Sequence, residues 1–287
     1  MRIARFVHPA TTRPDGAAVP SAVAWGVVEG PPDGGFDALT VAAIAEHPFG
    51  PISFTGDRWA LADVRLLSPI LPSKVVAIGK NYADHVAEMA ARAGDASAEP
   101  PAAPVIFLKP STSVIGDGDV IRLPADSTEI EHEAELAIVI GQPARDVSAE
   151  RAAEVILGFT CANDVTARDQ QRADGQWMRA KGHDSFCPIG PWIETVVDPT
   201  DLRITASVNG ELRQDGRTSQ LIHRIPELIA FMSQVMTLLP GDVILTGTPA
   251  GVGPIKDGDT VTVEIEGIGT LTNAVRSKKA LAARSAP

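Results

Sequence analysis

The segment 129–141 reads EIEHEAELAIVIG and begins with four glutamates at alternate positions: Glu129, Glu131, Glu133 and Glu135. Residues two apart on a β-strand point to the same face, so this spacing predicts one acidic face. The segment then becomes wholly apolar, which places Glu133 and Glu135 nearest to the core. Buried like charges need a compensating cation. The alternative is a solvent-exposed acidic edge strand.

Carboxylate oxygens are hard ligands, and an all-oxygen set favours Mg²⁺ or Mn²⁺, with Ca²⁺ as an alternative, over zinc. A third ligand is still required. Asp164 is the best local candidate, because it follows an apolar run in FTCANDVTARDQ, where a loop should begin. We therefore predict a divalent metal site made by Glu133, Glu135 and Asp164.

His85 and Glu88 are the acid–base candidates. They lie three residues apart on a helix expected over 81–92 and so share a face. A histidine paired with a carboxylate can deprotonate water near neutral pH. The alternative is the exposed polar face of a surface helix.

The segment GTPAG (247–251) combines small residues with a hydroxyl. Gly247 allows close approach of the backbone, and amide N–H groups together with the Thr248 hydroxyl could bind a substrate carboxylate. The alternative is a tight turn. Neither a lysine nor a helix pattern follows, so the glycines do not form a nucleotide-binding fingerprint.

These residues require a scaffold of strands with a few helices. Residues 1–70 read as short strands separated by turns at 14–16 and 32–34, which predicts a small β-rich N-terminal domain. Residues 71–287 form the second domain, with strands, a hairpin at Asn209-Gly210, and about three helices, expected at 81–92, 148–159 and 223–238. The fold class is α+β. The Ala/Pro-rich segment 94–104 is expected to be a mobile loop and the tail 277–287 to be loose.

The composition excludes several partners. The net charge is −11, no long Lys/Arg run occurs and only 5% of residues are aromatic, so neither nucleic acids nor anionic membranes are expected to bind. A metal ion would give such an acidic protein a local positive site for an acidic substrate. The isolated Cys161 and Cys187, expected to be small core residues, together with the lack of a signal peptide or long apolar span, predict a cytoplasmic protein.

Five sequence blocks, taken in order, resemble the fumarylacetoacetate hydrolase family, in particular its acylpyruvase and 2-hydroxyhepta-2,4-diene-1,7-dioate isomerase-like branch. The blocks are AIGKNYADHVAEM (77–89), EHEAELAIVIG (131–141), GFTCANDVTARDQQ (158–171), WMRAKGHDSFCPIGPW (177–192) and LTGTPAGVG (245–253). The resemblance covers about residues 74–275. It implies a mixed β-roll-like fold, a homodimer and chemistry on 2-oxo acids.

The resemblance also implies roles for single residues. It places the metal on Glu133, Glu135 and Asp164, and makes Lys181 an active-site lysine that holds the substrate carboxylate or a developing enolate; otherwise Lys181 is a surface lysine. Gln171 matches a residue that orients substrate or water, and the His85–Glu88 pair matches one on a lid.

Three further ionisable residues accompany this set. Arg168 either forms a structural ion pair or has a direct catalytic role. Lys109-Pro110 is similar to a family strand end near the site, and the role of Lys109 stays open. His132 replaces an aromatic residue that is common in relatives. Because it faces away from the metal ligands by alternation, we expect a packed or hydrogen-bonded core histidine.

The leading function is therefore a metal-dependent C–C bond hydrolase or decarboxylase for small 2-oxo or 2,4-dioxo acids of the acylpyruvate, fumarylpyruvate or oxaloacetate type. An alternative with the same metal site is a 2-hydroxyhepta-2,4-diene-1,7-dioate isomerase or 5-oxopent-3-ene-1,2,5-tricarboxylate decarboxylase in aromatic catabolism. A third, from another class, is a non-catalytic protein that binds a metal or a 2-oxo acid.

Overall fold

The computed structural model describes residues 1–12, 16, 18–31, 35–95 and 99–277. Of the expected turns, the one at 32–34 lies outside the described residues, and of the one at 14–16 only Gly16 is described. Residues 96–98 of the expected mobile loop and 278–287 of the expected loose tail also lie outside them.

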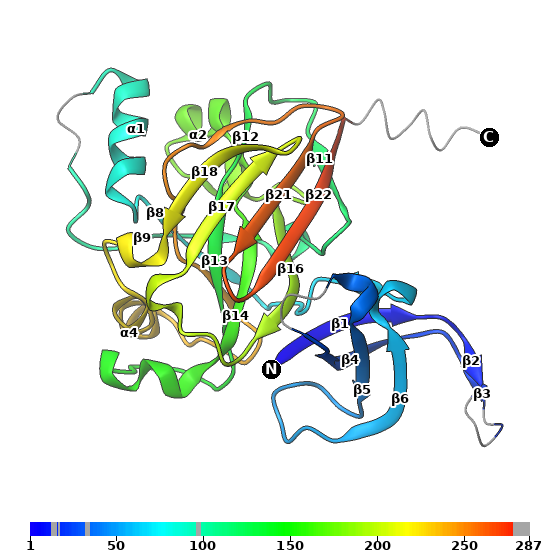
Figure 1. Ribbon diagram of the computed structural model, residues 1–287. Coiled ribbons are helices and arrows are strands. Elements are labelled where there is room, and N and C mark those ends of the chain that lie inside the picture. The colour runs from blue at the N-terminus through cyan, green and yellow to red at the C-terminus, as the bar shows by residue number, and fades with distance from the viewer. Residues whose placement is uncertain (13–15, 17, 32–34, 96–98, 278–287) are drawn as a thin grey trace.

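A mixed sheet of twelve strands forms the centre of the molecule (Figure 1). Ten strands follow one another in the order β6 (Phe54–Ala60), β5 (Thr40–Ile44), β4 (Ala22–Glu29), β1 (Arg2–His8), β16 (Cys187–Glu194), β14 (Ile156–Asn163), β13 (Ala134–Ile140), β19 (Val243–Leu245), β8 (Val75–Gly79) and β9 (Val105–Lys109). In addition, β7 (Arg65–Leu67) pairs with β1, and β10 (Val114–Ile115) pairs with β16. The β19–β8 and β10–β16 pairs are parallel.

A second, five-stranded sheet packs against the middle of the first. Its order is β11 (Val120–Leu123), β22 (Gly269–Ser277), β21 (Thr260–Ile265), β17 (Arg203–Val208) and β18 (Glu211–Arg217). The β17–β18 hairpin turns at Asn209 and Gly210, both at positive φ, as the Asn-Gly pair predicted. Apolar side chains of both sheets, such as Ile204 and Ile138, share the largest buried cluster. Because β13 is covered on both faces, every one of its residues is buried.

A small three-stranded sheet brings distant segments together. Its central strand β12 (Ile130–His132) lies between β15 (Thr166–Ala167) and β20 (Gly253–Pro254). The segment before β13, the segment after β14 and the segment that follows the GTPAG loop are therefore neighbours. The hairpin of β2 (Thr11–Thr12) and β3 (Ala18–Val19) forms a separate two-stranded sheet.

The described residues contain four α-helices rather than three: α1 (Ala83–Ala93), α2 (Arg168–Asp174), α3 (Met178–Lys181) and α4 (Ile225–Val235). Helices α1 and α4 confirm two expectations, and α1 ends at Gly94 in the left-handed conformation that favours glycine. The helix expected over 148–159 is a 3₁₀ helix at Ala149–Val155 that runs directly into β14. The helix prediction was wrong for the apolar end, residues 156–159, because this end pairs with β13 as a strand. Helices α2 and α3 are too short to show a helical period.

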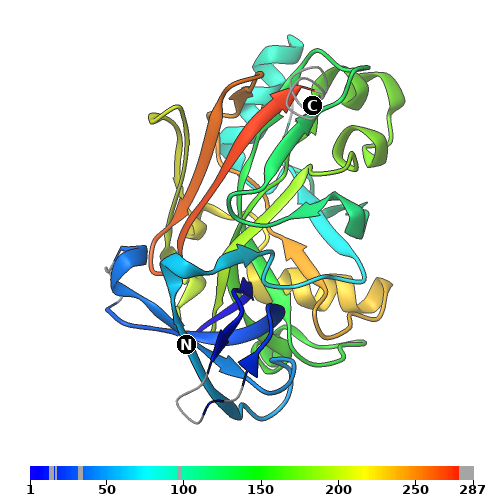
Figure 2. The same cartoon turned by 90° about the vertical axis from the view of Figure 1, so that its right-hand side faces the viewer.

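The N-terminal strands extend the main sheet, and the strands of the second domain differ in detail from the mixed β-roll-like fold expected for that domain. Strand β1 pairs with β4 on one side and with β16 on the other, where Ile3 lies opposite Ile193. These strands nevertheless enclose their own apolar cluster, with Phe6, Val41 and Trp59 among its members. Figure 2 shows the N-terminal strands at one end of the molecule, away from α1. Among the described helices, none is long and apolar enough to span a membrane.

Candidate metal centre and active site

Three buried carboxylates converge where β13 begins and β14 ends. One oxygen from each of Glu133, Glu135 and Asp164 lies within 4.8 Å of the others. The strand register causes this, because Ala134 pairs with Asn163 and the amide of Asp164 donates to the carbonyl of Glu133 at 2.8 Å. The three residues are at most 3% exposed.

This cluster fits a divalent cation. Burial, together with the charges of Asp164 and Glu133, raises the pKa of Glu135 well above its ordinary value, which reports repulsion among the carboxylates. Its donors are all carboxylate oxygens, the ligands that Mg²⁺, Mn²⁺ and Ca²⁺ prefer. Glu133, Glu135 and Asp164 could therefore hold such an ion.

The acidic face runs from solvent into the core. The Glu129 side chain is 51% exposed and pairs with Arg172, whereas that of Glu131 is 13% exposed and pairs with Arg168. The exposed-edge alternative thus describes Glu129, but it does not describe Glu133 and Glu135.

Two buried lysines neutralise part of the cluster. Lys181 Nζ donates to Glu133 Oε2 and Asp164 Oδ2, each at 2.6 Å, and Lys109 Nζ donates to Asp164 Oδ1 at 2.5 Å. Lys181 is therefore not a surface lysine. Burial alone would lower its pKa, but Asp164 and Glu133 outweigh burial and raise it, so the ammonium stays charged. The role of Lys109 could not be predicted from the sequence. Its signals are its place at the end of the apolar strand VIFLK and the similarity of Lys109-Pro110 to a family strand end near the site.

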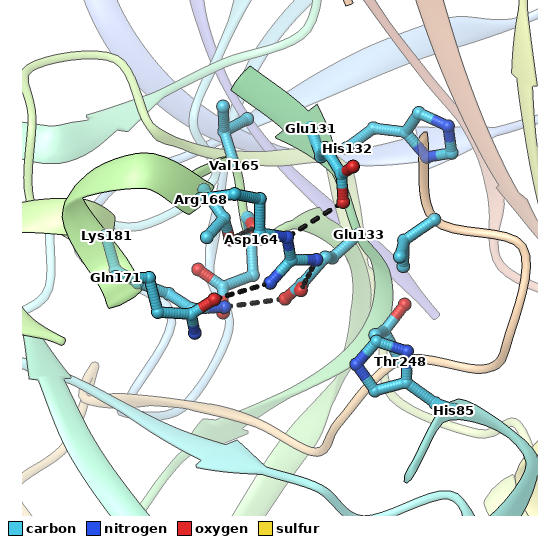
Figure 3. Close-up of polar contacts among 12 residues, drawn as sticks. His85, Glu131, His132, Glu133, Asp164, Val165, Arg168, Gln171, Lys181 and Thr248 are labelled. Atoms are coloured by element: carbon cyan, nitrogen blue, oxygen red, sulfur yellow. Dashed lines mark hydrogen bonds and ion pairs between the residues drawn. The ribbon is translucent and has the colours of Figure 1, made fainter. Parts of the chain in front are cut away.

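Arg168 ties the acidic strand to α2 (Figure 3). Its guanidinium donates to Glu131 Oε2 at 2.8 Å, to Glu133 Oε1 at 2.5 Å and to Gln171 Oε1 at 2.9 Å. Arg168 thus forms the structural ion pair that was one of its two expected roles. Burial would raise the pKa of Glu133, but Lys181 and Arg168 outweigh it and hold that pKa far below its ordinary value.

The loop after β19 supports the cluster from the other side. The amide of Gly247 donates to Glu135 Oε2 at 2.6 Å, and the Thr248 hydroxyl accepts a hydrogen bond from Gln214 at 2.7 Å. Gly247 has φ +108°, and an added Cβ would lie 2.7 Å from the Asn81 side chain, so only glycine fits here. His132 is fully buried with Nδ1 3.0 Å from Gln214 Oε1, which confirms the expected core histidine.

Both cysteines, Cys161 and Cys187, are free and fully buried, as expected for small core residues. Burial raises the pKa of the Cys187 thiol to about 12. Neither thiol is therefore ionised near neutral pH.

Helix α1 brings the acid–base candidates to the same place. His85 is buried, with Nδ1 3.5 Å from Glu88 Oε2, and it lines a cavity of about 290 Å³. Figure 3 shows its ring beside Thr248, across from Glu133. The cavity also contacts Glu133, Glu135, Arg168, Gln171, Lys181 and Thr248. The alternative prediction, the exposed polar face of a surface helix, does not describe His85, which is buried.

Arg92 fastens α1 over this cavity. Its guanidinium donates to Glu88 Oε1 at 2.8 Å, to Glu131 Oε1 at 2.9 Å and to the carbonyl of Val252 at 2.5 Å. Together with Arg168 it links the histidine pair on α1 to Glu133. Sequence spacing could not reveal these contacts, because they join segments far apart in the chain.

We expect Arg92→Met to loosen α1. Losing partly exposed ion pairs of this kind costs about 1 kcal/mol in total, so amide hydrogen exchange in α1 should accelerate about fivefold while that in α4 stays unchanged. Arg151→Met is the matched control, because Arg151 pairs with Glu154 at the surface. Equal exchange rates in both variants would show that Arg92 does not hold the helix.

Comparisons with known proteins agree with this arrangement. Residues 74–276 match the family described as fumarylacetoacetate (FAA) hydrolase C-terminal, and residues 1–69 match Rv2993c-like, N-terminal. Protein Rv2993c of Mycobacterium tuberculosis is 58% identical over 264 residues, which are 91% of this chain and 97% of that protein.

Two further relatives have names that state an activity. The crystal structure of 2-hydroxyhepta-2,4-diene-1,7-dioate isomerase from Mycobacterium marinum superposes with a TM-score of 0.85 at 55% identity, covering 97% of this chain and 99% of that one. The mitochondrial oxaloacetate tautomerase Fahd2a of Rattus norvegicus is 38% identical over 297 residues, covering 96% and 91%. The chain belongs to the fumarylacetoacetate hydrolase family, whose members are enzymes that act on small molecules.

Proposed function

We propose that this chain is a divalent-metal-dependent hydrolase or decarboxylase that cleaves a C–C bond in small 2-oxo or 2,4-dioxo acids of the acylpyruvate, fumarylpyruvate or oxaloacetate type. The observation that carries the proposal is the buried cluster of Glu133, Glu135 and Asp164, of which Glu133 and Glu135 line a cavity of about 290 Å³ together with Lys181. A dry site with a fixed cation suits an anionic substrate.

Glu133, Glu135 and Asp164 hold the metal in this proposal. When bound, Mg²⁺ or Mn²⁺ supplies Lewis-acid stabilisation of negative charge on the keto and carboxylate oxygens of the substrate. Gly247 donates to Glu135 and so positions a ligand. Its amide is already used there, which leaves the Thr248 side chain as the substrate contact from this loop.

Lys181 supplies the second positive charge. Its ammonium lines the cavity and its pKa is raised, so it can hold the substrate carboxylate or an enolate that forms when the bond breaks. Gln171 lines the same cavity and is oriented by Arg168, which suits it to position substrate or water. Arg168 itself acts through Glu133 and Gln171.

His85 is the general base of the hydrolytic reading. Because Nδ1 faces Glu88, Nε2 is the atom that takes a proton from the attacking water and later returns it to the leaving carbon. Glu88 orients the ring and is itself held by the amide of Gly251 at 3.1 Å and by Arg92.

A second candidate function uses the same residues without an attacking water. The names of relatives, an isomerase at 55% identity and an oxaloacetate tautomerase at 38%, favour proton transfer on an enolisable 2-oxo acid. In this reading the chain is a 2-hydroxyhepta-2,4-diene-1,7-dioate isomerase or 5-oxopent-3-ene-1,2,5-tricarboxylate decarboxylase of aromatic catabolism, or a tautomerase. The charged cavity and its histidine argue against the third reading, a non-catalytic binding protein.

One assay separates these candidates. The protein is incubated with Mg²⁺, Mn²⁺ or EDTA and with acylpyruvate, fumarylpyruvate or oxaloacetate, while enol absorbance, pyruvate and CO₂ are followed. Hydrolysis of an acylpyruvate or fumarylpyruvate releases pyruvate and a second acid, decarboxylation of oxaloacetate releases pyruvate and CO₂, and isomerisation changes absorbance alone. Pyruvate or CO₂ release that needs both metal and protein and exceeds the rate with metal alone supports the proposal, whereas binding without turnover of any acid favours the binding protein.

His85→Ala should divide hydrolysis from decarboxylation. Acylpyruvate cleavage should fall at least about 100-fold, because a positioned general base contributes that much. Decarboxylation of oxaloacetate should fall less than about tenfold, since it needs no activated water. Asp84→Ala, an exposed change on the same helix, is the control and should leave both rates intact. Equal loss of both activities would assign His85 to binding or to a shared proton transfer, and full retention would favour an isomerase with its base elsewhere.

The proposal includes the setting of the enzyme. Residues 1–70 form a small domain and residues 71–287 the catalytic domain of a cytoplasmic homodimer. Light scattering of the purified protein tests the dimer.

A further inference from the structure

Beyond the carboxylate cluster, apolar side chains line the cavity. Val86, Met89, Ala90 and Ala93 lie three and four residues apart on α1 and line one wall, and Trp177 lines another. This apolar stretch would cover the carbon chain of a substrate whose polar end lies at the carboxylates. Lys80 also borders the cavity, at the connection between β8 and α1, and its side chain is exposed.

The positive charges that line the cavity are engaged, with one exception. Lys181 and Arg168 contact Glu133, and Arg172 Nη2 donates to Glu129 at 2.7 Å. Lys80 makes no hydrogen bond or ion pair with any residue in the described parts of the chain. The ammonium of Lys80 therefore has no partner there, and it borders the cavity beside its apolar lining. It can bind an anionic group of a ligand.

The backbone holds Lys80 rigidly in this place. Its φ of 60° lies in the left-handed region, which costs a non-glycine residue about 1 kcal/mol. Asn81 fixes that conformation, because its buried amide donates to the carbonyls of His223 at 3.0 Å and Thr246 at 2.8 Å and accepts from the amide of His223. On the other side Gly79 lies so close to Trp177 that an added Cβ would be 2.3 Å from the indole ring.

Lysine brings no local structural advantage to such a position, where glycine or asparagine would fit with less strain. Strained positions that the surroundings fix are typical of sites that contact ligands. The presence of a lysine at this strained position is therefore explained by its charge and by its location at the cavity.

We propose that Lys80 binds a second carboxylate at the far end of the substrate and makes the site selective for dicarboxylic 2-oxo acids. The inference rests on the proposed function, because the first carboxylate and the keto group must lie at the cluster of Glu133, Glu135 and Asp164. It adds a specificity-determining residue and narrows the substrate class to 2-oxo acids with a negative charge at each end.

Binding of matched ligands tests this selectivity without turnover. Calorimetry in the presence of Mg²⁺ compares 2-oxoglutarate with 2-oxopentanoate, which has the same five carbons but lacks the second carboxylate, and uses oxalate as a probe of the metal end alone. The variants are Lys80→Met, which keeps the stem, and Lys80→Arg, which keeps the charge. Arg172→Met is the control for a neighbouring cation that is already paired.

The parent protein should bind 2-oxoglutarate more tightly than 2-oxopentanoate. Lys80→Met should weaken 2-oxoglutarate at least about fivefold and leave 2-oxopentanoate and oxalate unchanged, while Lys80→Arg and Arg172→Met keep the preference. Oxalate binding with an unchanged preference in Lys80→Met overturns this inference alone. Failure of the parent to bind oxalate and both 2-oxo acids overturns the proposed function and this inference with it.

Discussion

Replacing Glu135 with glutamine is expected to abolish divalent-cation binding and leave the metal-free protein at least as stable as the parent. The raised pKa of Glu135 means that its charged form is disfavoured in the folded state, so at neutral pH the charge opposes folding. Glutamine removes that charge and keeps an acceptor for the amide of Gly247. Activity should be lost, because the metal site loses a ligand.

Thermal unfolding with and without Mg²⁺ or Mn²⁺ measures both effects. A cation at 100 times its dissociation constant stabilises the folded state by about 2.7 kcal/mol, so the parent should melt at a higher temperature with metal and Glu135→Gln should not. Glu129→Gln is the control on the same strand, because Glu129 is exposed and pairs with Arg172. A metal-dependent increase in the melting temperature of Glu135→Gln would remove this residue from the ligand set.

Glu133 should respond in the opposite way, although sequence spacing alone treats the two residues as equivalent. Lys181 and Arg168 hold its pKa low despite burial, so its charge stabilises the folded protein. Glu133→Gln should therefore lower the melting temperature of the metal-free protein, in contrast to Glu135→Gln.

The alternation of glutamates was enough to predict which carboxylates lie in the core. A period of two fixes the face of a strand, and the apolar run after Glu135 fixes its buried end. Asp164 could be predicted because it follows a strand that is itself apolar. The neighbouring cations could not be predicted from spacing, because Lys109 reaches Asp164 from 55 residues away through the pairing of separate strands.

Local sequence periods also decided which elements of the fold could be predicted. Helices α1 and α4 have eleven residues each and show an apolar face, whereas α2 and α3 have seven and four residues, too few for a period to appear. The pairing of β1 with β16 joins Arg2 to Glu194, and no local pattern records it. A sequence pattern therefore predicts local geometry, whereas the long-range pairing of strands depends on the whole chain.

Lys181→Met should show whether the Lys181 ammonium acts on the substrate or only neutralises the carboxylate cluster, as other buried cations do. The change removes one of the two buried cations that each of Glu133 and Asp164 contacts, the ammonium at 2.6 Å, which costs about 3–5 kcal/mol of folding free energy in the absence of metal. A divalent cation should restore much of this loss, because it binds more tightly when a competing positive charge is removed. The increase in melting temperature on adding Mg²⁺ should therefore exceed that of the parent. Even with metal bound, kcat/KM should fall at least about 100-fold, since a charge-assisted contact in a dry site contributes roughly 3 kcal/mol.

Lys109→Met is the matched control. Lys109 is as deeply buried and contacts Asp164 at 2.5 Å, yet it is not among the described residues that line the cavity. It should therefore share the loss of metal-free stability and its rescue by Mg²⁺, but lose no more than about tenfold in kcat/KM. If the two methionine variants are stabilised by metal to the same extent and have the same kcat/KM, the charge of Lys181 serves the fold and does not contact the substrate. A loss of activity confined to Lys181→Met places that charge on the reacting anion, because stability and metal binding are then equal in the two variants.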